Sequence, residues 1–133
     1  MPCIFCQIIA GELPSHKLYE DDHVVVFLDI FPSVLGHTLV VPKKHSENML
    51  GLEPHEAEAA VAAVQKITPG ILKAVGAEGF NLTCNTGKVS GQMVMHTHFH
   101  ILPRKAGDGK ALWGQMDPKP DLPTLAENIR AAL

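Results

Sequence analysis

Three histidines spaced two residues apart are the part of this chain best suited to chemistry. His96, His98 and His100 are each separated from the next by a single residue. Because successive side chains of a strand point to opposite faces, an extended run places all three imidazoles on one face, roughly 6.6 Å apart. Phe99 and Ile101 would then bury on the other face, against a core. An incidental, tag-like cluster lacks such apolar partners, so the pattern predicts an imidazole-lined cleft.

A cluster of imidazoles suits nucleophilic attack on phosphorus. A neutral imidazole is a competent nucleophile near pH 7, since its unperturbed pKa is ~6.5. One ring nitrogen must carry a lone pair while the other is held as a donor, often by a backbone carbonyl. Upstream, residues 85–92 form a polar loop with glycines, whose backbone N–H groups can cradle an anion. Such a loop alone is often a plain turn, but beside the histidines it favours a phosphate site.

Two cysteines at the start of the chain have metal-ligand spacing. A thioredoxin-like pair needs a preceding strand, and Cys3 and Cys6 lie too near the start for one. A structural zinc needs two further ligands, for which His45 and His96 are the candidates. Alternatively, the two thiols pack as small hydrophobic groups without a metal.

Length and composition bound the class of protein. The chain has 133 residues, 46% of them apolar, and a formal net charge of −3. These values predict a single domain. The negative net charge argues against the basic surface that is typical of a nucleic-acid-binding protein. No apolar stretch approaches the ~20 residues of a membrane span. Three cysteines and the lack of a secretory signal favour a reducing compartment, so we expect a cytoplasmic protein with no membrane partner.

The elements that must position the histidines follow an α+β pattern. Short apolar runs bounded by turn residues predict strands over residues 16–20, 23–29, 37–42, 80–84 and 95–102. Three- and four-residue spacing predicts a main helix over 54–76, with a kink or break at Pro69-Gly70. Shorter helices are expected over 4–10, 46–50 (capped by Ser46) and 122–132, with an extended tail over 105–121. Hairpins imply antiparallel pairing, and the missing G-x-G-x-x-G argues against a dinucleotide-binding fold.

The histidine run, with Gly91-Gln92 ahead of it and Ile101-Leu102 after it, resembles the motif of the histidine triad (HIT) superfamily, in particular its bacterial Hint-like branch. Further segments match family signatures in family order: residues 3–9, 20–22, 27–32, 36–45 and 79–87. The resemblance covers residues 1–104, interpreted as a HIT domain, while residues 105–133 form a C-terminal extension.

The resemblance implies a fold and an activity. The fold would be a five-stranded antiparallel sheet with one main helix and a C-terminal helical tail. Two copies would form a homodimer in which the sheets join. The protein would bind purine nucleotides and catalyse hydrolysis or transfer at the α-phosphorus of nucleotidyl substrates, such as phosphoramidates or dinucleoside polyphosphates. The reaction would pass through a nucleotidyl-histidine intermediate.

The resemblance also assigns roles to residues. His98 would be the nucleophile, with His100, His37 and His96 as the other histidines of the site, and Asp29 would accept from the ribose. The apolar base slot would be Ile4, Phe5, Ile8 and Ile30. The phosphate would lie at Asn85, Gly91 and Gln92. A structural zinc would be bound by Cys3, Cys6, His45 and His96. Met93 departs from the family pattern, because relatives often carry a polar residue there.

Two alternatives remain open at this point. In one, His96 and His98 both bind a catalytic zinc, as His-x-His pairs can, which leaves the cysteine pair unexplained. In the other, the protein binds nucleotides as a scaffold with little activity. The departure from the family pattern at Met93 is consistent with this alternative. Sensitivity to chelators separates zinc catalysis from a histidine nucleophile, and trapping a nucleotidyl-enzyme separates an enzyme from a scaffold.

Overall fold

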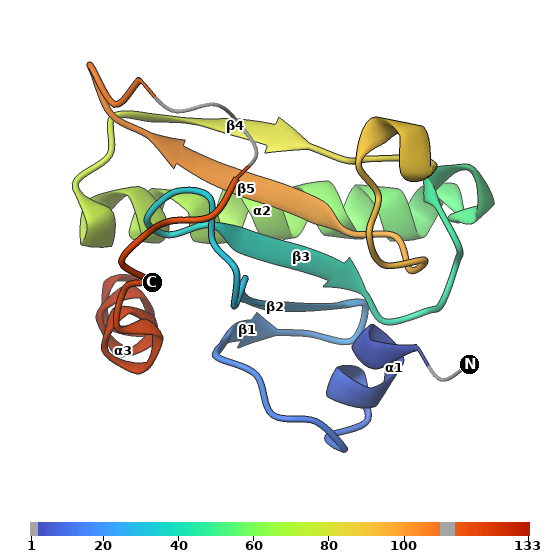
Figure 1. Cartoon of the computed structure of the whole chain (residues 1–133). Helices are drawn as coiled ribbons and strands as arrows, with labels where there is room; N and C mark the ends of the chain where they lie inside the picture. The colour runs from blue at the N-terminus through green and yellow to red at the C-terminus, as the bar shows by residue number, and fades with distance from the viewer. Residues whose placement is uncertain (1–2, 110–113) are drawn as a thin grey trace.

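The computed structural model describes residues 3–109 and 114–133, and its five strands form one antiparallel sheet. The sheet order is β1-β2-β3-β5-β4, with the main helix α2 along one face (Figure 1). The expected α+β fold, with a main helix and a C-terminal helix, is confirmed. The elements are α1 (Ile4–Ile9), β1 (Lys17–Glu20), β2 (Val24–Leu28), β3 (Thr38–Pro42), the 3-10 helix η1 (Met49–Gly51), α2 (Pro54–Val75), β4 (Gly79–Thr83), the 3-10 helix η2 (Lys88–Ser90), β5 (Phe99–Arg104) and α3 (Leu122–Ala132). Residues 110–113 of the predicted tail lie outside the described residues.

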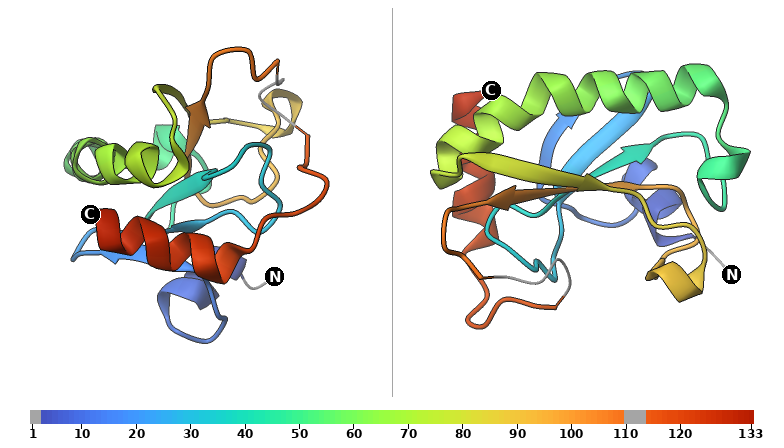
Figure 2. Two further views of the ribbon diagram at one scale, coloured as in Figure 1. Left: turned by 90° about the vertical axis from the view of Figure 1, so that its left-hand side faces the viewer. Right: turned by 90° about the horizontal axis from the view of Figure 1, so that it is seen from above.

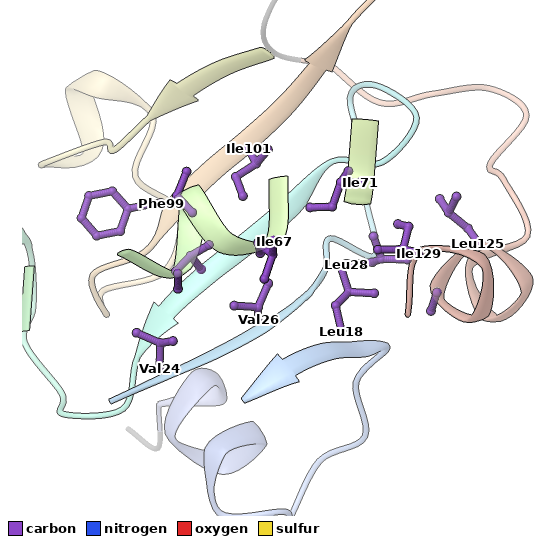
Figure 3. Close-up of a cluster of buried hydrophobic side chains, with 14 of the residues drawn as sticks. Leu18, Val24, Val26, Leu28, Ile67, Ile71, Phe99, Ile101, Leu125 and Ile129 are labelled. Atoms are coloured by element: carbon purple, nitrogen blue, oxygen red, sulfur yellow. The ribbon is translucent and has the colours of Figure 1, made fainter. Parts of the chain in front are cut away.

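Both faces of the central strands are covered, which explains their continuous apolar sequence. Val24, Val26 and Leu28 of β2 point into a core shared with α2 and α3 (Figure 3). Val25 and Phe27, the alternate residues, belong to a second cluster that also contains Phe5 of α1. Figure 2 shows the resulting layers, with α2 on one face of the sheet and α1 and the η2 loop on the other. The second face is the one that carries the polar site.

Helix α2 is continuous through Pro69-Gly70, so of the expected kink or break, the break is wrong. The buried stripe passes through Ile67, Ile71 and Val75 as the spacing predicts. A Cβ at Gly70 would lie 2.7 Å from Leu133 Cδ2, so this glycine lets the C-terminal end of α3 approach α2. No helix among the described residues is long and apolar enough to cross a membrane.

The C-terminal helix shares the main core. Asp121 caps α3, since its Oδ1 accepts from the Thr124 N–H at 3.1 Å. Leu125 and Ile129 are buried in the cluster that α2 forms with the sheet. Residues 122–132 therefore form a helix as predicted, docked on the body of the protein.

The histidine run lies mostly ahead of its strand, which corrects the prediction of a strand over 95–102. β5 begins at Phe99, opposite Val40 of β3. Pro42 has no N–H to extend the ladder, and the Thr97 N–H donates instead to Ser46 O at 2.9 Å. The short helix expected over 46–50 starts later and is a 3-10 helix: η1 begins after Asn48, not Ser46, and the Asn48 side chain accepts from the Leu50 N–H.

Candidate active site and candidate metal centre

A cavity of about 540 Å³ opens on the face of the sheet away from α2. Its apolar wall comes largely from α1 and strands β2 and β3, and polar groups gather at His98, His100, His37 and Asp29. Of the residues singled out in the sequence, the cavity is lined by Ile4, Phe5, Ile8, Asp29, Ile30, His37, Gly91, His98 and His100. It is not lined by Asn85, Gln92 or His96.

His98 is anchored in a way that fixes its tautomer. Its Nδ1 lies 2.8 Å from the carbonyl oxygen of His96 and must donate a proton to it. The lone pair is therefore on Nε2. The ring of Phe5 meets His98 edge-on, with centroids 5.0 Å apart. Burial lowers the pKa of His98, so the ring is neutral near pH 7, as a nucleophile must be.

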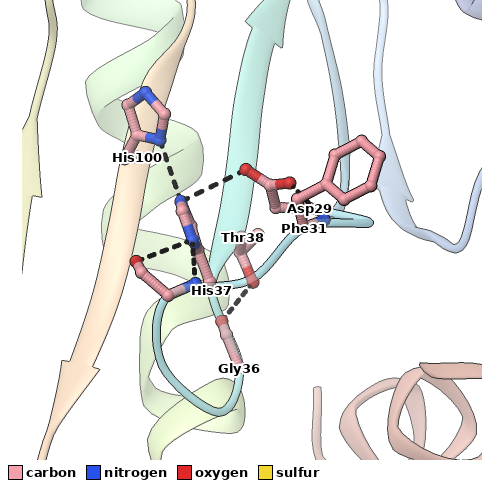
Figure 4. Close-up of polar contacts among 7 residues, drawn as sticks. Asp29, Phe31, Gly36, His37, Thr38 and His100 are labelled. Atoms are coloured by element: carbon pink, nitrogen blue, oxygen red, sulfur yellow. Dashed lines mark hydrogen bonds and ion pairs between the residues drawn. The ribbon is translucent and has the colours of Figure 1, made fainter. Parts of the chain in front are cut away.

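His37 and His100 form a hydrogen-bond chain whose direction is set by the main chain (Figure 4). The Ser33 N–H donates to His37 Nδ1 at 3.1 Å, so His37 carries its proton on Nε2. That Nε2 lies 2.9 Å from His100 Nδ1 and donates to it. His100 consequently carries its proton on Nε2, and it can donate a hydrogen bond while remaining neutral.

The charge state of this chain follows from its burial. Desolvation, with the nearby His98 and His37, lowers the pKa of His100 to about 3. Desolvation also lowers the pKa of His37 despite the opposing effect of Asp29. The 3.5 Å contact between His37 Nε2 and Asp29 Oδ2 is therefore no ion pair near pH 7. Asp29 is oriented separately, because its Oδ1 accepts from the Phe31 N–H at 2.8 Å.

The loop ahead of the histidines is shaped by Gln92, which is buried rather than exposed to the cavity. Gln92 Oε1 accepts from the Gly87 N–H at 2.8 Å, and its Nε2 donates to Glu47 O at 2.7 Å and to Val94 O at 3.0 Å. Gly91 lines the cavity with φ of +107°, and a Cβ there would lie 3.2 Å from Asn85 Nδ2. Gly91 is thus the residue of this loop that brings the backbone to the cavity.

The four predicted zinc ligands do come together. Cys3, Cys6, His45 and His96 place their ligand atoms within 4.8 Å of one another. His96 Nδ1 lies 3.3 Å from Cys3 Sγ, 3.6 Å from Cys6 Sγ and 3.0 Å from His45 Nδ1. A tetrahedral zinc with two sulfur and two nitrogen ligands has edges of roughly 3.3–3.8 Å. The donor set and its spacing fit such an ion.

His96 belongs to this cluster and not to the cavity. Its Nε2 donates to Pro42 O at 2.8 Å, which turns the Nδ1 lone pair toward the two thiols. A backbone carbonyl on the second nitrogen is the usual arrangement for a metal-bound histidine. Among the described residues, no group suited to a metal combines His96 with His98. The alternative of a catalytic zinc on that pair therefore has no support.

A second group of potential metal ligands consists of Asp29, His37 and His100. This group is less suited to binding a metal ion. Their ligand atoms lie within 4.8 Å of one another. A metal on His37 Nε2 would move the proton of that ring to Nδ1, where the Ser33 N–H already donates. Two donors would then face each other. The main chain therefore favours the hydrogen-bond chain over a metal.

Sequence reasoning missed several residues of the site. Ser33 orients His37, yet a backbone N–H leaves no signal in the sequence. Gly114 and Gln115 line the cavity, although the C-terminal extension was assigned no role in the site. The Met116 N–H donates to Pro32 O at 2.7 Å and holds this part of the extension beside the cavity.

Comparisons with known proteins identify the family. The model of the HIT domain family matches residues 10–107. An uncharacterized HIT-like protein of Methanocaldococcus jannaschii is 50% identical over 110 residues, covering 83% of this chain and 84% of the relative. An adenylylsulfatase of Arabidopsis thaliana is 44% identical over 111 residues, covering 84% of this chain and 55% of that protein.

The fold agrees with solved structures at the level of the whole chain. A zinc-bound histidine triad family protein from Mycobacterium smegmatis superposes with a TM-score of 0.89 and 36% identity, covering 99% of this chain and 93% of the other. The sequence and structure matches extend far beyond the histidine motif. This chain belongs to the histidine triad family.

Proposed function

We propose that this protein is a nucleotidyl hydrolase or transferase that acts at the α-phosphorus of purine nucleotidyl substrates, phosphoramidates or dinucleoside polyphosphates. One observation carries the proposal: the carbonyl of His96 holds His98 Nδ1, so His98 offers the lone pair of Nε2 in a cavity that also contains Asp29 and His100. Membership of a nucleotide-binding family supports it. So does the Arabidopsis relative, which is named an adenylylsulfatase, an enzyme that hydrolyses an adenylyl compound.

Each part of the cavity has a task in this proposal. The base packs between Ile4, Ile8 and Ile30, since a purine is flat and largely apolar. The Asp29 carboxylate accepts from the ribose hydroxyls, as charge-assisted hydrogen bonds favour. The phosphate lies beside His98, where His100 donates its Nε2 proton in a hydrogen bond to a phosphoryl oxygen.

The reaction then runs in two displacements. His98 Nε2 attacks phosphorus, the N–P bond forms, and the bond to the leaving group breaks with its electron pair going to that group. Water next attacks the nucleotidyl-histidine, the N–P bond breaks, and the pair returns to His98 Nε2. The proton of the water goes to solvent, and a nucleoside monophosphate is released.

A structural zinc on Cys3, Cys6, His45 and His96 is part of the proposal. When bound, the ion supplies a cross-link and no catalytic step. The link would join the start of α1 to the segment that carries His98. Ile4, Phe5 and Ile8 of α1 line the cavity. By holding the start of α1, the four zinc ligands would therefore fix the position of the apolar base slot. The zinc-bound relative from Mycobacterium smegmatis supports this assignment.

A homodimer is the proposed assembly, with β4 as its contact. β4 is an edge strand of the sheet, and its Phe80 and Leu82 are 42% and 41% exposed. Exposed apolar side chains on an unpaired edge favour pairing with a second chain. An antiparallel β4–β4 contact would join two sheets into one. Sedimentation equilibrium of wild type and Leu82→Lys tests it: a monomeric wild type contradicts the dimer.

Trapping the covalent intermediate tests the function. Purified protein is mixed with a panel of adenosine and guanosine phosphoramidates and dinucleoside polyphosphates, quenched within one turnover, and digested for mass spectrometry. We expect a nucleotidyl mass increment on the peptide that contains His98, together with nucleoside monophosphate as product. Tight nucleotide binding without turnover or adduct on any substrate would instead identify a scaffold.

A further inference from the structure

The main chain around His98 lies ahead of both ladders of β5. On this side, the pairing of β5 with β3 ends at Phe99 and its pairing with β4 ends at His100. The ladder hydrogen bonds that hold a strand therefore do not fix residues 96–98. Yet this segment directs the His98 ring, because His98 Nδ1 is bound to the carbonyl of His96, two residues away. Another contact must hold the main chain here.

Thr97, the residue between the two histidines, makes that contact with Ser46. The Thr97 N–H donates to Ser46 O at 2.9 Å, and the Thr97 hydroxyl donates to the same oxygen at 3.3 Å. The two hydroxyl oxygens are 2.6 Å apart. Since the proton of Thr97 goes to the carbonyl, the Ser46 hydroxyl donates to Thr97 Oγ1. Three hydrogen bonds therefore join the two residues.

The contact is shielded from water and stiff. Thr97 is 1% exposed and Ser46 is 9% exposed. Buried hydroxyls find their partners within the protein, and here each has the other. The branched Cβ of threonine also restricts χ1. The hydroxyl pair thus limits the position of the Thr97 backbone, and with it that of the His96 carbonyl and the His98 ring.

The segment that carries Ser46 is held to the cavity wall by a second contact. The carbonyl of Glu47, the next residue, accepts from Gln92 Nε2 at 2.7 Å. Gln92 follows Gly91, which lines the cavity. A hydrogen bond from Thr97 to this segment therefore orients the run before β5 relative to the rest of the cavity.

We propose that Ser46 and Thr97 are positioning residues, whose paired hydroxyls hold the main chain before β5 so that His98 Nε2 faces the cavity. This role rests on the proposed function, in which His98 is the nucleophile. Neither Ser46 nor Thr97 lines the cavity, so they act through His98 and not on the substrate. Misplacing a reacting group by about 1 Å can cost about 10²-fold in rate. A loosened main chain should therefore slow nucleotidyl transfer and leave nucleotide binding intact.

Two substitutions at Thr97 separate the hydroxyl from the shape of the side chain. Thr97→Val keeps the branched shape without the hydroxyl, and the single-turnover rate of His98 nucleotidylation by an adenosine phosphoramidate should fall by about tenfold or more. Thr97→Ser keeps the hydroxyl and should keep the wild-type rate. In both, the Kd of a nucleoside monophosphate, measured by calorimetric titration, should be unchanged. A wild-type rate in Thr97→Val, or equal losses in both variants, overturns the proposal.

A double variant separates positioning from stability. Thr97→Val alone leaves the Ser46 hydroxyl without its partner, whereas Ser46→Ala/Thr97→Val removes both hydroxyls, so thermal stability should partly recover. The rate should stay low, because the hydroxyl pair is still absent, and its recovery along with stability overturns the role. Thr68→Val is the control. It removes a buried hydroxyl that donates to Val64 O within α2, and it should lower stability without changing the rate.

The tautomer of His98 gives a readout that needs no turnover. NMR of isotope-labelled histidine rings shows which nitrogen carries the proton. In wild type and Thr97→Ser we expect the proton of His98 on Nδ1 alone, and in Thr97→Val a mixture of tautomers, because the His96 carbonyl is no longer held in place. A single tautomer in Thr97→Val overturns the proposal. A wild type with the expected tautomer that forms no adduct with any substrate overturns the proposed function instead.

Discussion

Two histidines only two residues apart are anchored to the main chain through opposite ring nitrogens. His96 donates from Nε2 to Pro42 O, and His98 donates from Nδ1 to His96 O, each at 2.8 Å. His96 therefore turns the lone pair of Nδ1 toward Cys3 and Cys6, while His98 keeps its lone pair on Nε2, in the cavity. The same residue type, in one motif, becomes a metal ligand or a nucleophile according to which nitrogen the backbone holds.

The two regions also differ in how their polar atoms are arranged. In the Cys/His cluster, four donor atoms converge on one point, as a cation requires. In the cavity, the polar atoms form a chain instead: His37 Nε2 donates a hydrogen bond to His100 Nδ1, in a direction set by the Ser33 N–H. The regions are connected, since the His96 carbonyl orients His98. The contrast predicts that variants in the cluster change stability, and variants in the cavity change chemistry.

The largest expected effect comes from His98→Ala. Loss of a covalent nucleophile should lower turnover by at least ~10³ while folding and nucleotide affinity stay nearly intact. Steady-state kinetics and calorimetric titration with a nucleoside monophosphate measure the two quantities. His45→Ala is the matched control, because it removes an imidazole from the cluster and should leave adduct formation measurable. Retention of more than a tenth of wild-type kcat in His98→Ala contradicts the covalent mechanism.

Next in size is the effect of removing a zinc ligand. Cys3→Ser should lower zinc content, which we expect to be close to one ion per chain, and thermal stability with it. At free zinc a thousand times its Kd, bound metal stabilises by about 4 kcal/mol, which the variant would lose. Elemental analysis and thermal unfolding measure both quantities, with Cys84→Ser, outside the cluster, as the control. Zinc-free protein with fully reactive thiols, purified without chelator, rules out this role.

The sequence predicts most of the fold because its signals are local. Short apolar runs place β2 and β3, helical spacing places α2 and α3, and Gly76, with φ of +70°, ends α2 close to the predicted residue 76. The errors arise where tertiary contacts override local pattern. In the sequence, Gly70 predicts an interruption of the helix. In the structure, the missing Cβ of Gly70 leaves room for Leu133 to pack against α2. β5 begins only at Phe99, because Pro42 on the neighbouring strand β3 has no N–H to extend the ladder to earlier residues.

The groups of the candidate site also divide into those that the sequence predicts and those that only the folded chain reveals. Side chains with an obvious chemistry, such as His98, Asp29 and the two N-terminal cysteines, can be found from the sequence. Gln92 is the opposite case: it was expected at the phosphate, but its amide is used by its own loop. Backbone groups such as the Ser33 N–H, which decide tautomers, belong to no motif and become visible only in the folded chain.

A smaller effect is expected at the ribose. Asp29→Asn keeps an acceptor for the Phe31 N–H but removes the charge, so it should weaken nucleotide binding by roughly 1.5–3 kcal/mol, the range for a hydrogen bond to a charged group. In wild type, 2′-deoxynucleotides should bind more weakly than ribonucleotides by a similar free energy. In the variant, ribo- and deoxyribonucleotides should bind with equal affinity. Titration calorimetry with matched ribo- and deoxyribonucleotides measures this. Equal affinity for both sugars in wild type contradicts the role of Asp29.

The smallest effect, counted per pH unit, is the contribution of His100 to the pH dependence of the free energy of unfolding. Its pKa is about 3 in the folded protein and about 6.5 when unfolded. Above pH 6.5 neither state binds the proton, so the contribution is constant. Below pH 6.5 the unfolded state takes up a proton that the folded state does not, and the free energy of unfolding falls by up to about 1.4 kcal/mol per pH unit.

His100→Asn isolates this contribution from that of the Cys/His cluster. The asparagine oxygen can take the place of Nδ1 as acceptor for His37, but it does not titrate. Zinc ligands take up protons in the same pH range in both proteins, so their effect cancels in the difference. Urea unfolding between about pH 7.5 and pH 4.5 should give a slope shallower by up to one proton in the variant. Equal slopes would mean that His100 is not held neutral by its burial, and the hydrogen-bond chain in the cavity would then carry a charge.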